Sequence, residues 1–198
     1  MIPPLIDAPL LARGPHTRKV KQLVVHSMAE YVVNKDPDAG PVGRISAHAW
    51  LQAVGLSAHA LVRPDGAVLE CVPLEQRAYH AKGHNDGTVG VELLLQGEHD
   101  FTSFARALGW DVEAWAAVPP EQRPAADPYR AEQYEAVAWW LERAARRFEL
   151  DWQAVTSHDR LDPDRKFDPG PLFGWLRLEQ RFAELALIGG EAGPPGAG

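Results

Sequence analysis

The stretch SHDRLDPDRKFDPGPLF, residues 157–173, brings together side chains that can bind a metal. It holds His158, Lys166 and Asp168, and its prolines prevent it from forming one continuous helix. Imidazole nitrogens and carboxylate oxygens are zinc ligands, and a catalytic zinc site uses three protein ligands with one position open. The spacing is equally compatible with a solvated surface loop, in which Lys166 is a surface charge and Asp168 a turn residue before Pro169. Both interpretations are open at this point.

Two apolar segments elsewhere carry further candidates. KQLVVHS is typical of a buried strand that ends near Ser27, with His26 at its end, and TVGVELLL over 88–95 predicts a central strand that contains Glu92. A carboxylate among apolar neighbours is costly unless it is paired or used in function. The alternatives are that Glu92 faces solvent and that His26 is a core histidine bonded to a backbone carbonyl.

Another candidate, His80, lies in AYHAKGHND, just before a run of small and polar residues. Loops of that composition often line binding sites. A histidine that only makes a structural hydrogen bond explains the same pattern equally well.

The rest of the chain predicts the elements that must position these side chains. We expect an extended lead-in over 1–17, a loop over 34–43, irregular structure over 97–130 and a disordered tail over 188–198. Helices are expected at ISAHAWLQAVG, with Gly55 as its C-cap, at YRAEQYEAVAWWLERAARRFEL and, closing the domain, at PLFGWLRLEQRFAELALI. A hairpin is expected around Pro64-Asp65-Gly66, and a short strand or extended segment at WQAVTSH. Strands mixed with helices predict an α/β fold: one domain with a mixed central β-sheet flanked by helices.

Composition narrows the class of protein. The chain has 198 residues, enough for one domain with its own core. Its formal net charge of -7 argues against binding to duplex nucleic acid, and no apolar run reaches the ~18–20 residues of a membrane span. The N-terminus lacks the pattern of a signal peptide, so we expect synthesis in the cytoplasm. Cys71 is the only cysteine, which rules out an intrachain disulfide.

Four segments together resemble a known family. HSMAEY, GLSAHALVRPDGAVLECVP, YHAKGHNDGTVGVEL and SHDRLDPDRKFDPGPLFGW follow one another as in the zinc N-acetylmuramoyl-L-alanine amidases of the second type. That family includes muropeptide-recycling amidases, phage amidases and peptidoglycan recognition proteins. The resemblance spans about residues 20–180 and implies a catalytic domain over 18–187 with an insertion at 97–130.

The resemblance implies a metal site with one zinc ion per chain. His26 corresponds to the first ligand, in the VVH motif, and His158 to the second, in SHD. Asp168, in RKFDPG, corresponds to the third ligand, as in the recycling enzymes.

The resemblance also implies roles around the metal. Glu92 matches the carboxylate beside the metal-bound water, and Lys166 matches the lysine near the scissile carbonyl. His80 matches a histidine that lines the substrate groove, and His59 matches a structural position. Phage relatives have a catalytic tyrosine where this chain has Ala58, so the version of the site that uses Glu92 is expected here.

The activity implied is hydrolysis of the amide between N-acetylmuramic acid and L-alanine, in peptidoglycan or in soluble muropeptides. The alternative is a non-catalytic module of the same fold that binds muropeptides, and a general zinc peptidase is disfavoured because HExxH is absent. We expect a monomer that acts in the cytoplasm, or on the cell wall if it is released or exported by another route. A recycling enzyme, a phage-type endolysin and a delivered effector stay open.

Overall fold

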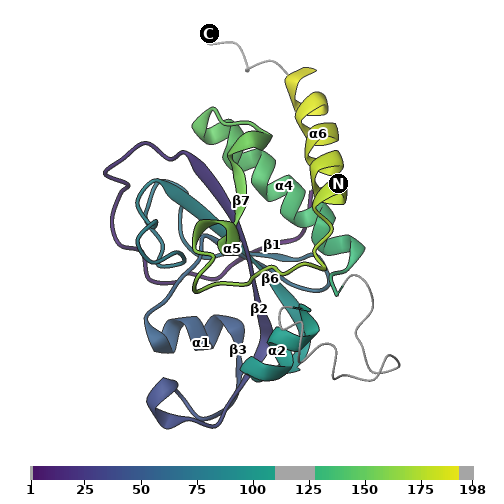
Figure 1. Cartoon of the computed structure of the whole chain (residues 1–198). Helices are drawn as coiled ribbons and strands as arrows, with labels where there is room; N and C mark the ends of the chain where they lie inside the picture. Colours follow the sequence, from purple (N-terminus) through teal and green to yellow (C-terminus); the bar gives the residue numbers. More distant parts are fainter. Residues whose placement is uncertain (1, 110–127, 192–198) are drawn as a thin grey trace.

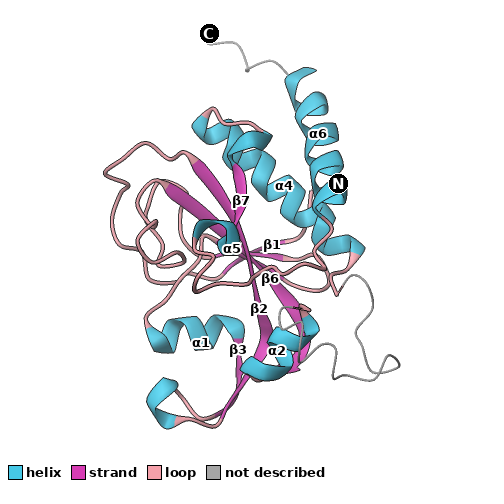
Figure 2. Cartoon of the chain, viewed as in Figure 1, coloured by secondary structure: helices cyan, strands magenta, loops and turns pink. Residues whose placement is uncertain are grey.

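A seven-stranded mixed β-sheet forms the centre of the chain (Figures 1 and 2). The computed structural model describes residues 2–109 and 128–191. Within them the strand order is β1-β5-β4-β6-β2-β3, with β7 also paired to β2. The strands are β1 (Leu5–Asp7), β2 (Gln22–Asn34), β3 (Gly43–Ser46), β4 (Ala60–Val62), β5 (Val68–Glu70), β6 (Thr88–His99) and β7 (Val155–Ser157). The helices are α1 (Ala47–Val54), α2 (Phe101–Ala107), α4 (Ala131–Phe148), α5 (His158–Leu161) and α6 (Trp175–Glu191), with 3-10 turns at Pro37–Ala39 and Trp152–Ala154.

The two long strands β2 and β6 run parallel through the middle of the sheet. The expected strand end near Ser27 is wrong, because β2 continues to Asn34. After a register shift beyond Ala29, β2 pairs antiparallel with β3 from Tyr31 onward, and these bonds extend the strand. His26 therefore lies within β2 and not at its end.

Helices cover the two faces of the sheet unequally. α4 lies against one face, where residues such as Val25 and Val91 join the larger hydrophobic core, and α6 lies beside α4 (Figure 1). α1 lies against the opposite face, where Met28 and Leu94 belong to a smaller apolar cluster. Because side chains alternate along a strand, His26 and Glu92 share the face of Met28 and Leu94.

Several predicted elements are confirmed. The α1 helix begins after the Ser46 N-cap and ends at Gly55, whose left-handed backbone (φ 71°) suits glycine. The hairpin of β4 and β5 forms as expected, and the helix expected over 129–150 is present as α4. Within 152–158, the expected short strand or extended segment, only Val155–Ser157 forms a strand, because Trp152–Ala154 is a 3-10 turn.

Other boundaries differ from the expectation. The segment expected to be irregular from 97 contains the end of β6 and the helix α2, whose N-cap Asp100 accepts a hydrogen bond from the Ser103 N–H. The helix α6 begins at Trp175 and continues through Glu191, past the expected start of the tail at 188. Residues 110–127 of the expected insertion, which include Trp110 and Trp115, lie outside the described residues.

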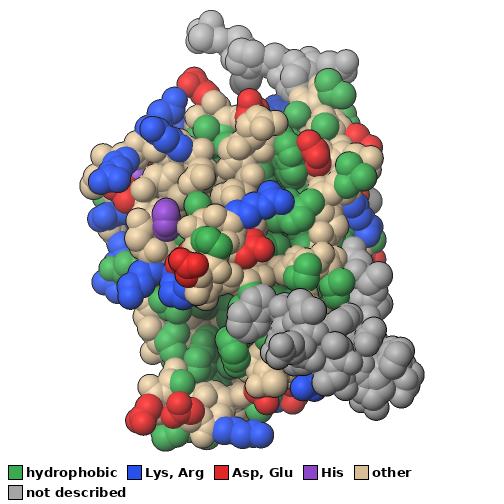
Figure 3. Space-filling model, viewed as in Figure 1, with side chains coloured by type: hydrophobic (Ala, Val, Ile, Leu, Met, Phe, Trp, Pro, Cys, Tyr) green, Lys and Arg blue, Asp and Glu red, His purple; other side chains and the backbone are tan. Residues whose placement is uncertain are grey.

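The surface carries charges of both signs. On the face drawn in Figure 3, Lys and Arg side chains and Asp and Glu side chains both occur, with hydrophobic side chains between them. Among the described residues, no helix combines the length and apolarity that a membrane crossing requires.

Candidate metal centre

Strand register places three candidate residues next to one another. β7 runs parallel to β2 with Ser157 opposite Val25, so the chain after each of these residues continues into His158 and His26. On the other side of β2, Glu92 of β6 is the direct partner of His26. His26 and Glu92 therefore lie on adjacent parallel strands and His158 directly follows β7 on the other side of β2, although the three residues are distant in sequence.

A compact turn returns the chain to these strands with Asp168. After the single helical turn of α5, the Asp162 carbonyl accepts hydrogen bonds from the Arg165 N–H (3.1 Å) and the Lys166 N–H (2.9 Å). The Asp159 N–H then bonds the Asp168 carbonyl at 3.1 Å. The 157–173 stretch is thus an ordered loop, and its solvated-loop interpretation does not hold for the buried Asp168.

The side chains of His26, His158 and Asp168 converge on one point. His26 Nδ1 lies 2.8 Å from His158 Nδ1. Asp168 Oδ2 lies 3.1 Å from His158 Nδ1 and 3.4 Å from His26 Nδ1. One ligand atom from each residue lies within 4.8 Å of the others, and all three residues are buried. Two nitrogens and one carboxylate oxygen are a donor set that zinc accepts, so these residues could bind a metal.

Charge and burial act on these ligands in opposite directions. Burial lowers the pKa of His26 to about 4, against the effect of the neighbouring Asp168 carboxylate. Burial raises the pKa of Asp168, but hydrogen bonds to His158 and His26 outweigh it and hold that pKa below its usual range. A neutral His26 imidazole and an ionised Asp168 carboxylate are the protonation states that metal ligands need.

Glu92 lies beside this cluster with one oxygen in an unusual environment. Its side chain is partly exposed, yet Oε2 is buried without a hydrogen-bond partner. Burial, and secondarily the charge of Asp168, raises the pKa of the Glu92 carboxyl, while the charge of Lys166 lowers it. An orphaned carboxylate oxygen next to a ligand cluster is typical of a functional group.

Lys166 lies two residues before Asp168 and is partly exposed. Its positive charge lowers the pKa of both Glu92 and His26, so it lies near enough to act on this cluster electrostatically. Phe167 between them is buried and packs edge-on against Phe101 at a centroid distance of 5.7 Å. Phe167 therefore anchors the segment that presents Lys166 and Asp168.

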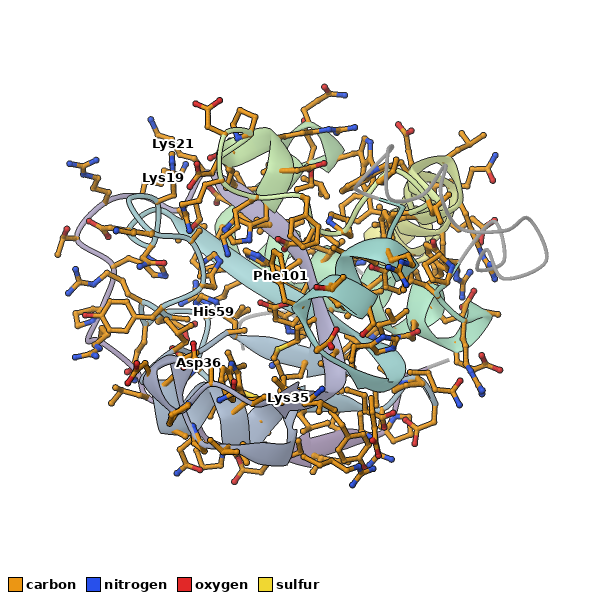
Figure 4. All side chains as sticks on the ribbon, turned by 60° about the horizontal axis from the view of Figure 1, so that its bottom comes forward. Lys19, Lys21, Lys35, Asp36, His59 and Phe101 are labelled. Carbon is orange, nitrogen blue, oxygen red and sulfur yellow. The ribbon has the colours of Figure 1, made fainter. Side chains whose placement is uncertain are left out.

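The two other histidines named from the sequence, His59 and His80, also lie in the interior. His59 is buried, and in Figure 4 it lies inside the molecule, whereas Lys19 and Lys21 lie at its periphery. Its ring accepts a hydrogen bond from the Gly90 N–H (3.0 Å) and contacts the Gln76 carbonyl at 2.9 Å, as a structural residue would. His80 is also largely buried, and its Nδ1 lies 2.8 Å from His26 Nε2.

Sequence reasoning missed the residues that support His80. Thr88 and Gly90 precede Glu92 on the same face of β6, and both lie against the His80 ring. The signal was the alternation in TVGVELLL, in which polar or small residues occupy every second position before Leu94.

A sizeable surface cavity lies away from this centre. It has a volume of about 890 Å³ between β5 and α4, and Trp139 is among its lining residues. The cationic residues Arg143 and Arg147 at its wall are paired with Glu70 and Glu75. None of the three candidate metal ligands lines this cavity, so the cavity is separate from the candidate metal centre despite its size.

The chain is similar to known amidases in sequence. The family model described as N-acetylmuramoyl-L-alanine amidase matches residues 16–171. The 1,6-anhydro-N-acetylmuramyl-L-alanine amidase AmpD of Enterobacter cloacae is 30% identical over 177 residues, which cover 83% of this chain and 81% of that protein.

Solved structures show the same fold. A crystal structure of a selenomethionine AmpD derivative aligns with a TM-score of 0.58 at 24% identity, covering 90% of this chain and 93% of the other. The N-acetylmuramyl-L-alanine amidase AmiD from E. coli, in complex with anhydro-N-acetylmuramic acid-L-Ala-D-gamma-Glu-L-Lys, aligns with a TM-score of 0.57 at 24% identity, covering 83% of this chain and 58% of that one.

Proposed function

The chain belongs to the N-acetylmuramoyl-L-alanine amidase family, and from this premise we propose that it hydrolyses the amide bond between N-acetylmuramic acid and L-alanine in muropeptides. The observation that carries the proposal is the convergence of His26, His158 and Asp168 on one point, with Glu92 as the register partner of His26. A ligand set and a neighbouring proton acceptor are the two parts that metal-assisted amide hydrolysis requires.

The three converging residues would hold one zinc ion. Their two nitrogens and one carboxylate oxygen match a catalytic zinc site with an open fourth position. Zinc, when bound, supplies Lewis acidity that polarises a carbonyl and makes water a better nucleophile. The Ser27 N–H lies 3.4 Å from Asp168 Oδ2 and helps to orient that carboxylate.

Glu92 and Lys166 would act on the substrate itself. Glu92 takes the proton of the attacking water and passes it to the leaving nitrogen, for which a raised pKa is favourable. Lys166 stabilises the negative charge that develops on the carbonyl oxygen. The amide C–N bond breaks, water supplies the hydroxyl to the lactyl carbonyl, and L-alanine leaves with a free amine.

A soluble anhydromuropeptide is the substrate class that the relatives favour. The AmpD relatives, which are named as 1,6-anhydro-N-acetylmuramyl-L-alanine amidases, are 29–30% identical to this chain. We therefore propose an enzyme that acts on soluble muropeptide fragments.

The test is release of the stem peptide from two substrates. Purified anhydromuropeptides and intact sacculi are incubated with the protein in zinc-containing buffer, with and without a chelator, and free peptide is quantified by mass spectrometry. The proposal predicts chelator-sensitive release that is faster from the soluble fragments. Preferential cleavage of sacculi would support a lytic enzyme instead. Binding of muropeptides without any release would support the non-catalytic module.

A further inference from the structure

A chain of hydrogen bonds extends behind His26, away from the metal-facing atoms. His26 Nε2 lies 2.8 Å from His80 Nδ1, and His80 Nε2 lies 3.1 Å from Thr88 Oγ1. Thr88 Oγ1 in turn donates to the backbone carbonyl of His84 at 2.7 Å. His26, His80 and Thr88 are all buried, so water does not compete for these contacts.

The far end of this chain determines where each proton lies. A hydroxyl has one proton, and Thr88 donates it to the His84 carbonyl, which can only accept. Thr88 Oγ1 must therefore accept from the Nε2–H of His80. A neutral imidazole has one donor and one acceptor nitrogen, so His80 Nδ1 is the acceptor.

The contact between His80 and His26 determines which nitrogen of His26 carries the proton. Because His80 Nδ1 accepts, the Nε2 of His26 carries the proton and donates it. His26 Nδ1 is then left with a free lone pair, and this is the atom that lies 2.8 Å from His158 Nδ1 and 3.4 Å from Asp168 Oδ2. The hydrogen-bond chain thus selects the tautomer of His26 that can bind a metal through Nδ1.

The surrounding backbone is built to admit the His80 ring at this place. A Cβ atom at Gly90 would lie 2.3 Å from His80 Nδ1, a distance that two such atoms never adopt, so glycine leaves the room the imidazole occupies. The Asn85 side chain also accepts hydrogen bonds from the backbone N–H groups of His80 (3.1 Å) and Ala81 (2.7 Å). Both the ring and the backbone of His80 are therefore held.

We infer that His80 and Thr88 are positioning residues that fix the tautomer and the ring orientation of His26 for metal binding through Nδ1. The inference rests on the proposed function, since it assumes that His26 holds the zinc. It gives His80 a role different from the expected lining of the substrate groove, because both of its ring nitrogens are engaged in the interior. Outer partners of this kind typically change metal affinity by about 10- to 100-fold when they are removed.

Two matched pairs of variants test the inference. Thr88→Val removes the acceptor for His80 with almost no change of shape, whereas Thr88→Ser retains the hydroxyl. His80→Leu removes the acceptor for His26, whereas His80→Asn keeps an amide oxygen on the same side. Zinc affinity is measured by competition with a chromophoric chelator, after circular dichroism has established that each variant is folded.

A second readout reports the tautomer directly. The ¹⁵N shifts of the histidine rings in the zinc-free protein distinguish a protonated Nε2 from a protonated Nδ1. We expect Thr88→Val and His80→Leu to weaken zinc binding by about 10- to 100-fold and to shift the tautomer equilibrium of His26. Thr88→Ser and His80→Asn should recover most of the affinity.

The outcomes separate this inference from the proposed function. If the wild-type protein binds zinc and Thr88→Val binds it within twofold with an unchanged His26 tautomer, the inference is wrong while the proposed function stands. If His80→Leu does not fold, the Thr88 pair alone decides. If the wild-type protein binds no zinc, the proposed function fails first, and the inference falls with it.

Discussion

His26 and Glu92 are direct register partners across the parallel strands β2 and β6, so a metal ligand and a carboxylate project side by side from the same face of the sheet. Neighbouring strands lie about 4.8 Å apart. This separation is enough for a carboxylate to act on water near a metal without itself being one of the converging ligands. The pairing gives different roles to two residues that are far apart in sequence.

Glu92→Gln should abolish most turnover while leaving metal binding intact. The substitution keeps the size of the side chain but removes the proton acceptor, and general-base catalysis contributes about 10²- to 10⁴-fold. The measurement is kcat on anhydromuropeptide together with bound zinc per chain by elemental analysis. Glu98→Gln, an exposed position on the same strand, is the control. Wild-type turnover in Glu92→Gln would exclude Glu92 as the base.

Asp168→Ala should lose zinc. The carboxylate supplies the only anionic ligand atom in the converging set of His26, His158 and Asp168, so its removal leaves two neutral nitrogens. The zinc content after dialysis should fall from about one per chain to near zero. Asp164→Ala, an exposed acid in the same loop, should retain the metal. A stoichiometric zinc in Asp168→Ala would contradict the ligand assignment.

Lys166→Met should lower kcat without releasing the metal. The lysine charge acts on Glu92 and His26, and the removal of one group that stabilises an oxyanion costs about 10²- to 10³-fold in kcat. The substitution preserves the apolar stem of the side chain, so folding should be unaffected. Lys19→Met removes an exposed lysine at the periphery and provides the comparison (Figure 4). Equal kcat values in the two variants would rule out a role for Lys166 in catalysis.

The zinc-free protein should lose stability as the pH falls below about 6.5, partly through His59. Burial lowers the pKa of His59 to about 3 in the folded state, from an ordinary value of 6.5. Between these values the unfolded chain binds the extra proton, so stability is present above pH 6.5 and decreases on acidification, by roughly 1.4 kcal/mol per pH unit for one group. Protonation would also break the hydrogen bond that Gly90 donates to His59 Nδ1.

Denaturant unfolding in excess chelator at several pH values measures this dependence. His59→Gln should flatten the pH slope by about one proton, while other buried histidines such as His26 sustain the rest. His84→Gln removes an exposed imidazole and serves as the matched control. An identical slope in His59→Gln and the wild type would show that His59 does not contribute.

The sequence alone was enough to predict the class of fold and the identities of the converging residues. Apolar periodicity predicted β6, α4 and the β4–β5 hairpin, because these elements depend on local pattern and turn chemistry. Four motifs in family order identified His26, His158 and Asp168, which the structure brings together.

Only the tertiary structure decided how these residues are supported. The length of β2 depends on pairing with β3 and β6, which local propensity does not encode. The direction of the hydrogen bonds from Thr88 through His80 to His26 depends on contacts between segments that are not adjacent in the chain, and so does the need for glycine at position 90. Residue type specifies which atoms can donate or accept, but only the folded arrangement specifies which nitrogen carries the proton.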